Sequence, residues 1–162
     1  MSYKVDKFFH TNLTSNPTTQ YISTTYEELS GSKCEIKSIN PDPDLVYKYT
    51  FNSWPDKSAS PEIYNFHINV KLQKSNDNFS SDINDITGYN FSISGDTNSS
   101  SDRYMQTVHC FFIVEDFDSS HLRVVARSYS TTTKAQLHRN NSFDGSTNLD
   151  LKTHPTLIVA EV

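Results

Sequence analysis

The sequence predicts an all-β protein, an antiparallel jelly-roll sandwich of about 8–10 strands with an extended N-terminal arm. Ser, Thr and Asn make up about a third of the 162 residues, whereas glycine occurs four times. Clusters of Asn, Ser and Asp form turns, and the Thr, Tyr, Phe, Val and Ile between them favour strands. Apolar residues recur with a period of two, and no segment has the period of an amphipathic helix.

Residues 1–19 form the predicted arm, because Phe8 and Phe9 are its only apolar pair and the stretch from Thr11 to Thr19 is polar. An exposed aromatic pair on an arm can dock onto a partner protein, and the alternative is that it folds back onto its own domain. Residues 20–162 then form the jelly-roll domain.

The first strands are expected at 21–26 and 34–39, and prolines and aspartates at 40–44 end the second one. The next strand, 45–51, places Tyr47, Tyr49 and Phe51 on one face. A loop follows at 52–61 and holds Trp54, the only tryptophan.

The segment 63–73 has the clearest alternation in the chain and is predicted to be a half-buried antiparallel strand. One face carries five apolar residues, namely Tyr64, Phe66, Ile68, Val70 and Leu72. The polar stretch 74–103 is expected to form two long loops around one short edge strand at 89–93.

Residues 104–115 and 122–129 are predicted to pair as a hairpin across the acidic turn 115–120. A further strand or extended edge is expected at 131–139, followed by turns at 140–146. The last strand, 156–162, is apolar on both faces, and so is 104–115. Strands of this kind need cover on both sides, which suggests a core or a subunit interface.

The composition argues against several classes of partner. The net charge of −5 and the pI of about 5.6 disfavour nucleic acid and anionic membranes. No apolar run is long enough for a membrane span, and the N-terminal residues do not resemble a signal peptide. A reducing cytoplasm is therefore the expected site of synthesis, with Cys34 and Cys110 free and buried.

The sequence contains no nucleotide-binding, nucleophile-elbow or zinc-protease motif, and no cofactor or metal is expected. The acidic turn at 115–118 lacks the spacing of a calcium loop. The protein is therefore predicted not to be an enzyme. Trp54 and Tyr89 lie in predicted Ser- and Asn-rich surroundings where an aromatic ring can stack on a sugar, although a lone aromatic more often plugs the edge of a core.

Several segments together resemble the jelly rolls of tumour-necrosis-factor-like and complement globular heads, which recur in phage fibre, knob and capsid-decoration proteins. The resemblance spans about residues 20–162 and depends on the pattern of 24–32, 46–51, 109–114, 122–127, 142–145 and 155–162. The chain has less glycine than many such heads.

This resemblance implies a homotrimer around a threefold axis, with the terminal strand near the axis. Aromatic residues dominate buried interface area. The candidate trimer-interface residues are Tyr47, Tyr49, Phe111, Phe112, Phe143, Leu157 and Val159.

The resulting functional hypothesis is a virion structural protein of a tailed phage, a trimeric surface protein that decorates the capsid or forms part of a tail fibre or knob. Phe8 and Phe9 on the arm would dock it to other capsid or tail proteins of the virion. Two alternatives remain open. One is a module that recognises a host surface glycan, and the other is a small β-sandwich enzyme.

Overall fold

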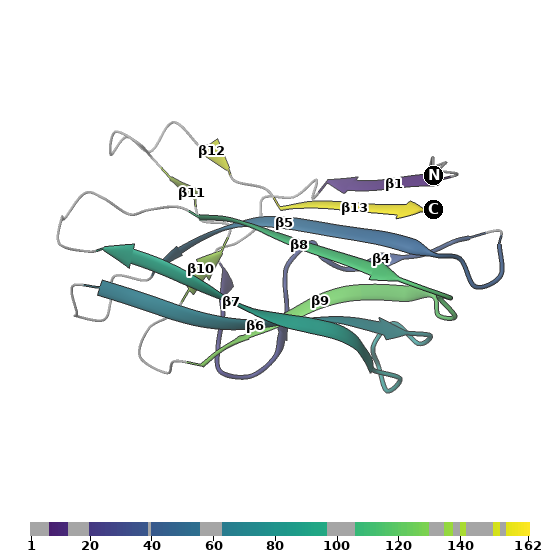
Figure 1. The fold of residues 1–162 in the computed structure, drawn as a ribbon, viewed down its shortest axis with the longest axis horizontal. Helices are drawn as coiled ribbons and strands as arrows, with labels where there is room; N and C mark the ends of the chain where they lie inside the picture. The colour runs from purple at the N-terminus through teal and green to yellow at the C-terminus, as the bar shows by residue number, and fades with distance from the viewer. Residues whose placement is uncertain are drawn as a thin grey trace.

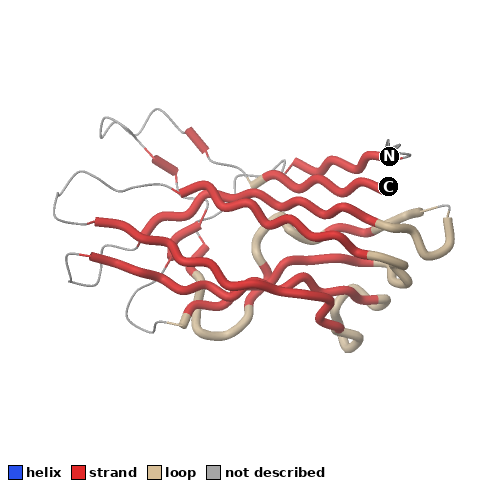
Figure 2. Tube along the Cα trace, viewed as in Figure 1, coloured by secondary structure: helices blue, strands red, loops and turns tan. Residues whose placement is uncertain are grey.

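The computed structural model describes residues 7–12, 20–38, 40–55, 63–96, 106–129, 135–137, 140–141, 151–152 and 155–162. All regular structure in these ranges is β-strand (Figure 2). They contain no helix of the length and hydrophobicity that a membrane crossing requires. The all-β prediction is confirmed.

Thirteen strands are present among the described residues. Their bounds are β1 Lys7–Asn12, β2 Gln20–Tyr21, β3 Glu27–Glu28, β4 Cys34–Glu35, β5 Leu45–Pro55, β6 Ile63–Ser75, β7 Asn84–Asp96, β8 Gln106–Val114, β9 His121–Ser128, β10 Ala135–Leu137, β11 Asn140–Asn141, β12 Leu151–Lys152 and β13 Thr156–Glu161.

The strands form two antiparallel sheets that pack face to face, with the small β11–β12 pair beside them (Figure 1). In the first sheet, called sheet A, the strand order is β1–β13–β5–β8. Beyond the end of β13, β10 pairs with the same side of β5, and β2 pairs with β10. In sheet B the order is β9–β6–β7, and β3 and β4 both pair with the outer side of β9.

The chain alternates between the two sheets. It crosses from β5 in sheet A to β6 in sheet B, makes the β6–β7 hairpin, returns to sheet A with β8 and crosses again to β9. These crossings are the connections of a jelly-roll sandwich. The predicted antiparallel sandwich is therefore confirmed.

The core lies between the inner faces of the sheets and is built from alternate residues of the long strands. β5 contributes Tyr47, Tyr49 and Phe51, each at most 1% exposed. Opposite them lie Ile68, Val70 and Leu72 of β6, Leu122, Val124 and Ala126 of β9, and Phe117. Removal of this apolar surface from water is the main driving force that stabilises the fold.

The two buried tyrosine hydroxyls reach main-chain acceptors in the turn between β3 and β4. Tyr47 donates to the Ser32 carbonyl, and Tyr49 donates to the Ser30 carbonyl at 2.7 Å. Both contacts are needed because a buried hydroxyl without an acceptor costs free energy.

Several sequence-based expectations for the elements are wrong. The hairpin of 104–115 with 122–129 does not form, since β8 pairs with β5 and β9 pairs with β6. Both strands alternate well enough to pair with each other, and only the packing of two sheets decides against it. The stretch 74–103 contains β7, a full partner of β6, instead of two long loops around a short strand. The strands expected at 21–26 and 34–39 are reduced to two residues each.

The predicted arm also contains regular structure. Residues 7–12 form β1, which pairs with β13 along its whole length and places Phe8 opposite Ala160 and Phe9 opposite Val159. This is the arrangement that the alternative, an arm folded back on its own domain, predicts.

Candidate functional site

Five of the seven candidate interface residues lie inside the core of a single chain. The exposed fractions are 0% for Tyr47 and Tyr49, 1% for Leu157 and Val159, and 3% for Phe112. Their side chains contact the opposite sheet of the same chain, so they offer no surface to a second copy. The expectation that these five form an interface is corrected: one sandwich supplies the cover for which the sequence suggested a partner.

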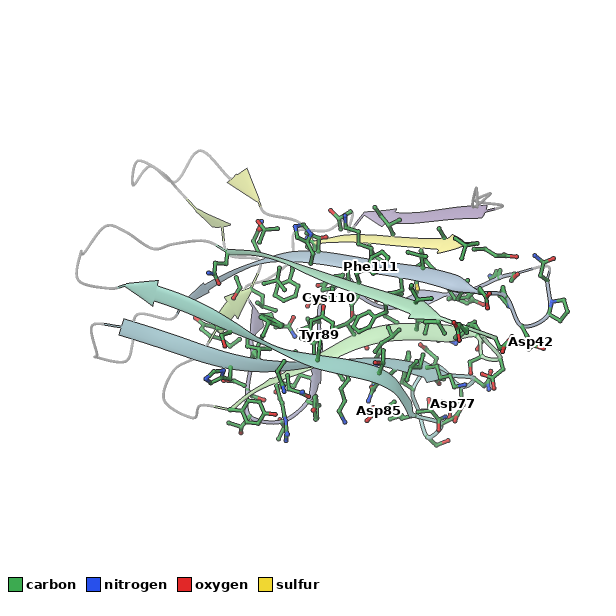
Figure 3. All side chains as sticks on the ribbon, in the orientation of Figure 1. Asp42, Asp77, Asp85, Tyr89, Cys110 and Phe111 are labelled. Carbon is green, nitrogen blue, oxygen red and sulfur yellow. The ribbon has the colours of Figure 1, made fainter. Side chains whose placement is uncertain are left out.

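Phe111 is different, because it lies on the outer face of sheet A. The side chain of Phe111 is 55% exposed and that of Ile113, two residues later on β8, is 61% exposed. Alternation along β8 explains this, since Cys110, Phe112 and Val114 face the core. Figure 3 labels Phe111 and its neighbour Cys110 on this strand. The sixth candidate, Phe111, is therefore available to a partner.

The register of sheet A extends this exposed pair into an apolar patch across three strands. Val46 pairs with Ile113 on one side and with Ala160 on the other. In the next row of the same face, Lys48 pairs with Phe111 and with Ile158. Ala160 itself is buried, so we define the sheet A patch by the remaining residues: Val46, Lys48, Phe111, Ile113 and Ile158.

The sheet A patch ends where the outer face becomes polar. In the following row Thr50 pairs with His109, and the Thr50 hydroxyl lies 3.0 Å from Nδ1 of His109. Beyond it the Thr107 hydroxyl donates to Oδ1 of Asn52 at 2.7 Å. An apolar centre with a polar border is the usual composition of a protein–protein interface.

The side chain of Tyr89 joins the two sheets. Its ring lies half-buried between the sheets, 5.5 Å from the Phe112 ring and 6.4 Å from the Phe91 ring. Its hydroxyl donates to the His109 carbonyl at 3.2 Å, and burial raises its pKa. Tyr89 therefore plugs the edge of the core, which is the more common role of a lone aromatic, and part of its surface lines a hollow between β7 and β8.

The remaining predicted site residues lie outside what the structure describes. Phe143 belongs to an undescribed range, and only the backbone is described for Phe8, Phe9 and Trp54. That backbone places the two phenylalanines on β1, and Trp54 on β5 opposite Gln136 of β10. Trp54 is therefore a strand residue and not, as predicted, a loop residue.

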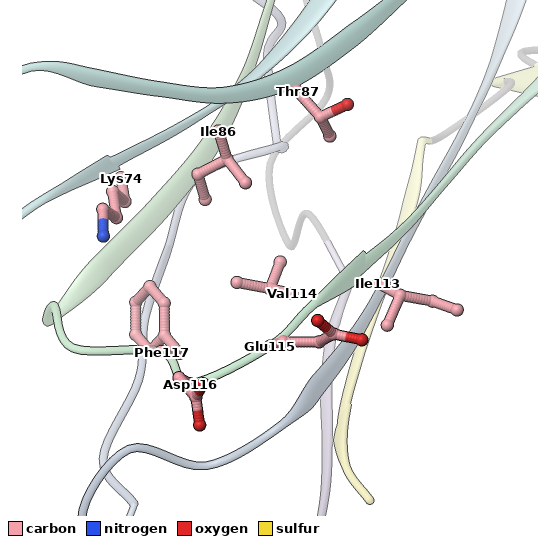
Figure 4. A pocket seen from close by; sticks show the side chains of 8 residues that line it. All are labelled: Lys74, Ile86, Thr87, Ile113, Val114, Glu115, Asp116 and Phe117. Carbon is pink, nitrogen blue, oxygen red and sulfur yellow. The ribbon is translucent and has the colours of Figure 1, made fainter.

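Two hollows open along the side of the sandwich between β7 and β8. One, of about 540 Å³, is lined by Tyr89, Phe91 and Val108 among others. The other, of about 520 Å³, includes Ile86, Val114 and Phe117, whose side chains converge, whereas Ile113 points away toward the outer face (Figure 4). Lys74, Glu115 and Asp116 also line the second hollow, and His109 lines the first.

The two cysteines are free thiols in apolar surroundings. Burial raises the pKa of the Cys34 thiol to about 12 and that of Cys110 to about 11. Thiols with raised pKa values are poor nucleophiles and poor metal ligands at neutral pH. Within the described ranges, no three His, Cys, Asp or Glu residues are grouped as metal ligands would be.

The sequence pattern missed Val46 and Ile158 as surface residues, although the signal was present. Once the tyrosines of β5 face inward, the alternate residues must face outward, and the same holds for β13. The missing information was which face of each strand meets the opposite sheet.

No protein-family model matches this chain, and no curated protein matches its sequence. Among solved structures, that of infectious bursal disease virus Gx strain is similar over 97% of this chain, with a TM-score of 0.41 and 7% identity. The dimeric latent PorU from Porphyromonas gingivalis is similar over 99%, with a TM-score of 0.39 and 9% identity. This chain spans 37% and 14% of the lengths of those two chains. Similarities of this degree say nothing about function.

Proposed function

We propose that the chain is a non-enzymatic structural protein of a virus particle, a homotrimer at the surface of a tailed phage that decorates the capsid or forms part of a tail fibre or knob. The observation that carries the proposal is the sheet A patch, in which Phe111 and Ile113 are more than half exposed on one sheet face. Contiguous apolar patches on soluble proteins usually mark interaction sites.

The second copy of the chain is the proposed occupant of this patch. The patch has aromatic and aliphatic residues and one lysine at its centre, and a polar border. This composition suits a contact between subunits of a cyclic oligomer. The number three comes from the resemblance to trimeric jelly-roll heads. Jelly rolls recur among viral capsid and lectin domains, so this fold is compatible with a virion protein. The fold alone does not determine the function.

The mechanism of such a protein is shape and multivalency. A trimer presents three identical contacts, so linked weak contacts raise the overall affinity without any chemical step. Assembly also stabilises the fold by mass action, since only the folded chain presents the patch.

The test is the mass in solution of the wild-type chain and of a Phe111→Ser/Ile113→Ser double variant, by light scattering after size-exclusion chromatography. We expect three times the 18.5 kDa chain mass for the wild type and a single chain mass for the variant. Both side chains are exposed, so the variant keeps its core. Ile83→Ser is the matched control, because Ile83 is 47% exposed but precedes β7 in sheet B.

A wild-type chain of single mass, or a double variant that stays assembled, contradicts the interface. The virion role is tested separately by labelling purified particles with an antibody against the chain. Labelled particles support it, and unlabelled particles contradict it whatever the oligomeric state.

A further inference from the structure

The outer face of sheet B carries an arginine between two tyrosine rings. The guanidinium carbon of Arg127, on β9, lies 4.8 Å from the ring centre of Tyr26 and 5.1 Å from that of Tyr129. Tyr129 is 54% exposed, whereas Arg127 and Tyr26 are partly buried. The two rings hold the guanidinium in place, and one of them remains open to solvent.

Arg127 differs from its neighbours in charge balance. On the same face Lys71 pairs with Asp85 at 2.5 Å, and Arg123 pairs with Glu28 at 3.3 Å. No carboxylate pairs with Arg127 in the part of the chain that the structure describes, and its buried Nε atom has no hydrogen-bond partner there. A guanidinium that is held in place but lacks an acidic partner is suited to bind a carboxylate of a ligand, because the two carboxylate oxygens match its planar N–H donors.

Polar side chains continue the row next to Arg127. Asn69 of β6 is opposite Arg127, and Asn90 of β7 is opposite Asn69, with their amides joined at 2.6 Å. The hydroxyl of Tyr26 donates to Oδ1 of Asn69. These bonds fix the amide orientation of Asn69.

One row further, His67 and Ser92 are both exposed and lie opposite each other, with Nδ1 and Oγ 2.9 Å apart. Exposed amides, a hydroxyl and an imidazole donate to and accept from hydroxyl groups. The face beside Arg127 therefore suits a ligand rich in hydroxyls.

The combination indicates the class of ligand. A sugar ring stacks its apolar face on an exposed tyrosine and hydrogen-bonds through its hydroxyls, while a carboxylate substituent pairs with arginine. Nucleic acid requires several unpaired cations in a row, and here a single unpaired guanidinium stands among the described residues of this face, on a chain with net charge −5.

We propose that the outer face of sheet B binds a carboxylate-bearing sugar of the uronic or sialic acid kind. Arg127 holds the carboxylate, Tyr129 supports the ring, and Asn90, His67 and Ser92 contact the hydroxyls. This site lies on the opposite sheet from the sheet A patch, so sugar binding can be tested whether or not the chain forms a trimer.

The test uses the full chain and three probes: 3′-sialyllactose, a hyaluronan tetrasaccharide and lactose. Amide shifts in nuclear magnetic resonance spectra give affinity and location together. We expect at least one acidic probe to bind, lactose to bind at least about tenfold more weakly, and the shifted amides to cluster at 67–71, 90–92 and 127–129. The sialyl and uronate arms distinguish the two kinds of acid sugar.

Three variants separate recognition from folding. Arg127→Gln is expected to remove the preference for the acidic probe, and Arg127→Lys to keep the charge but weaken binding because it loses the planar donor pair. Tyr129→Ala is expected to weaken every probe that binds, with Tyr21→Ala, an exposed tyrosine of sheet A, as control. Thermal unfolding without probe shows whether each variant is folded. The proposal is overturned if the wild-type chain binds no acidic probe at millimolar concentration, or if the shifted amides cluster elsewhere. It is also overturned if a folded Arg127→Gln variant keeps the wild-type preference for the acidic probe over lactose.

Discussion

At the residue scale, the sequence predicted alternation correctly but not its direction. Tyr47 and Tyr49 share a face as expected, yet that face is the core of one chain and not an interface. Alternation fixes which residues lie together, while the position of the second sheet decides which set is buried. For this reason the neighbouring residues Phe111 and Phe112 differ in exposure: Phe111 is 55% exposed and Phe112 is 3% exposed.

The buried ionisable groups lead to a prediction about pH. Burial raises the pKa of Cys34 from 9.0 to about 12 and that of Cys110 from 9.0 to about 11, and it raises the pKa values of Tyr47 and Tyr49 as well. The folded chain then keeps protons that the unfolded chain releases. The free energy of unfolding should be insensitive to these groups below pH about 9 and should fall as pH rises from about 9 to about 11–12.

Urea unfolding measured at a series of alkaline pH values checks this. Ellman's reagent gives a second readout at pH 8, where native thiols should not react and the same thiols should react in urea. Cys110 is buried and Cys34 is partly buried, so rapid modification of Cys110 in the native chain would contradict its placement.

At the element scale, long alternating strands were predictable and partner choice was not. β6 was expected within two residues of its observed end, because its alternation is strict. β7 was missed as a full strand because its sequence is polar on the outer face and includes Gly88. β8 and β9 both have the pattern of hairpin strands, and only the competition between two sheets separates them.

Gly88 allows a close approach between β7 and β6. A Cβ atom at this position would lie 2.5 Å from the Val70 carbonyl oxygen and 3.1 Å from Cγ of Lys71. Gly88→Ala should therefore push the strands apart and lower the free energy of unfolding by about 1–3 kcal/mol. Chemical denaturation measures the change. Thr87→Ala, at the exposed neighbouring position, is the control, and equal stability of both variants would show that β7 accommodates the methyl group.

At the scale of the whole molecule, the architecture was predictable from composition and periodicity, and the surfaces were not. A sandwich follows from many alternating strands with polar turns. Surface patches depend on register across strands that are distant in sequence: Lys48, Phe111 and Ile158 meet in one row of sheet A. No local pattern contains that information.

Removal of residues 159–162 should unfold the chain instead of yielding a folded monomer. The deletion takes Val159, Ala160 and Glu161 out of sheet A, where they pair with both β5 and β1. It also removes the Glu161 carboxylate, which accepts from Ser38 at 2.9 Å and from Asn40. We expect loss of the cooperative unfolding transition seen by circular dichroism.

Deletion of Val162 alone is the matched control. Val162 is 38% exposed and lies beyond β13, so its loss should leave a cooperative transition. A shortened chain without residues 159–162 that still unfolds cooperatively would mean that β13 is dispensable for sheet A.

The position of β13 also has a consequence for the order in which the protein is made. β13 lies between β5 and β1 although it is synthesised long after both, so sheet A stays split on the ribosome until β13 has left the exit tunnel. The β6–β7 hairpin, by contrast, forms from neighbouring segments and is complete early in translation. During that interval β5 has no β13 to pair with and keeps an unpaired edge. We therefore expect nascent chains to be more prone to aggregation than the finished chain until β13 pairs.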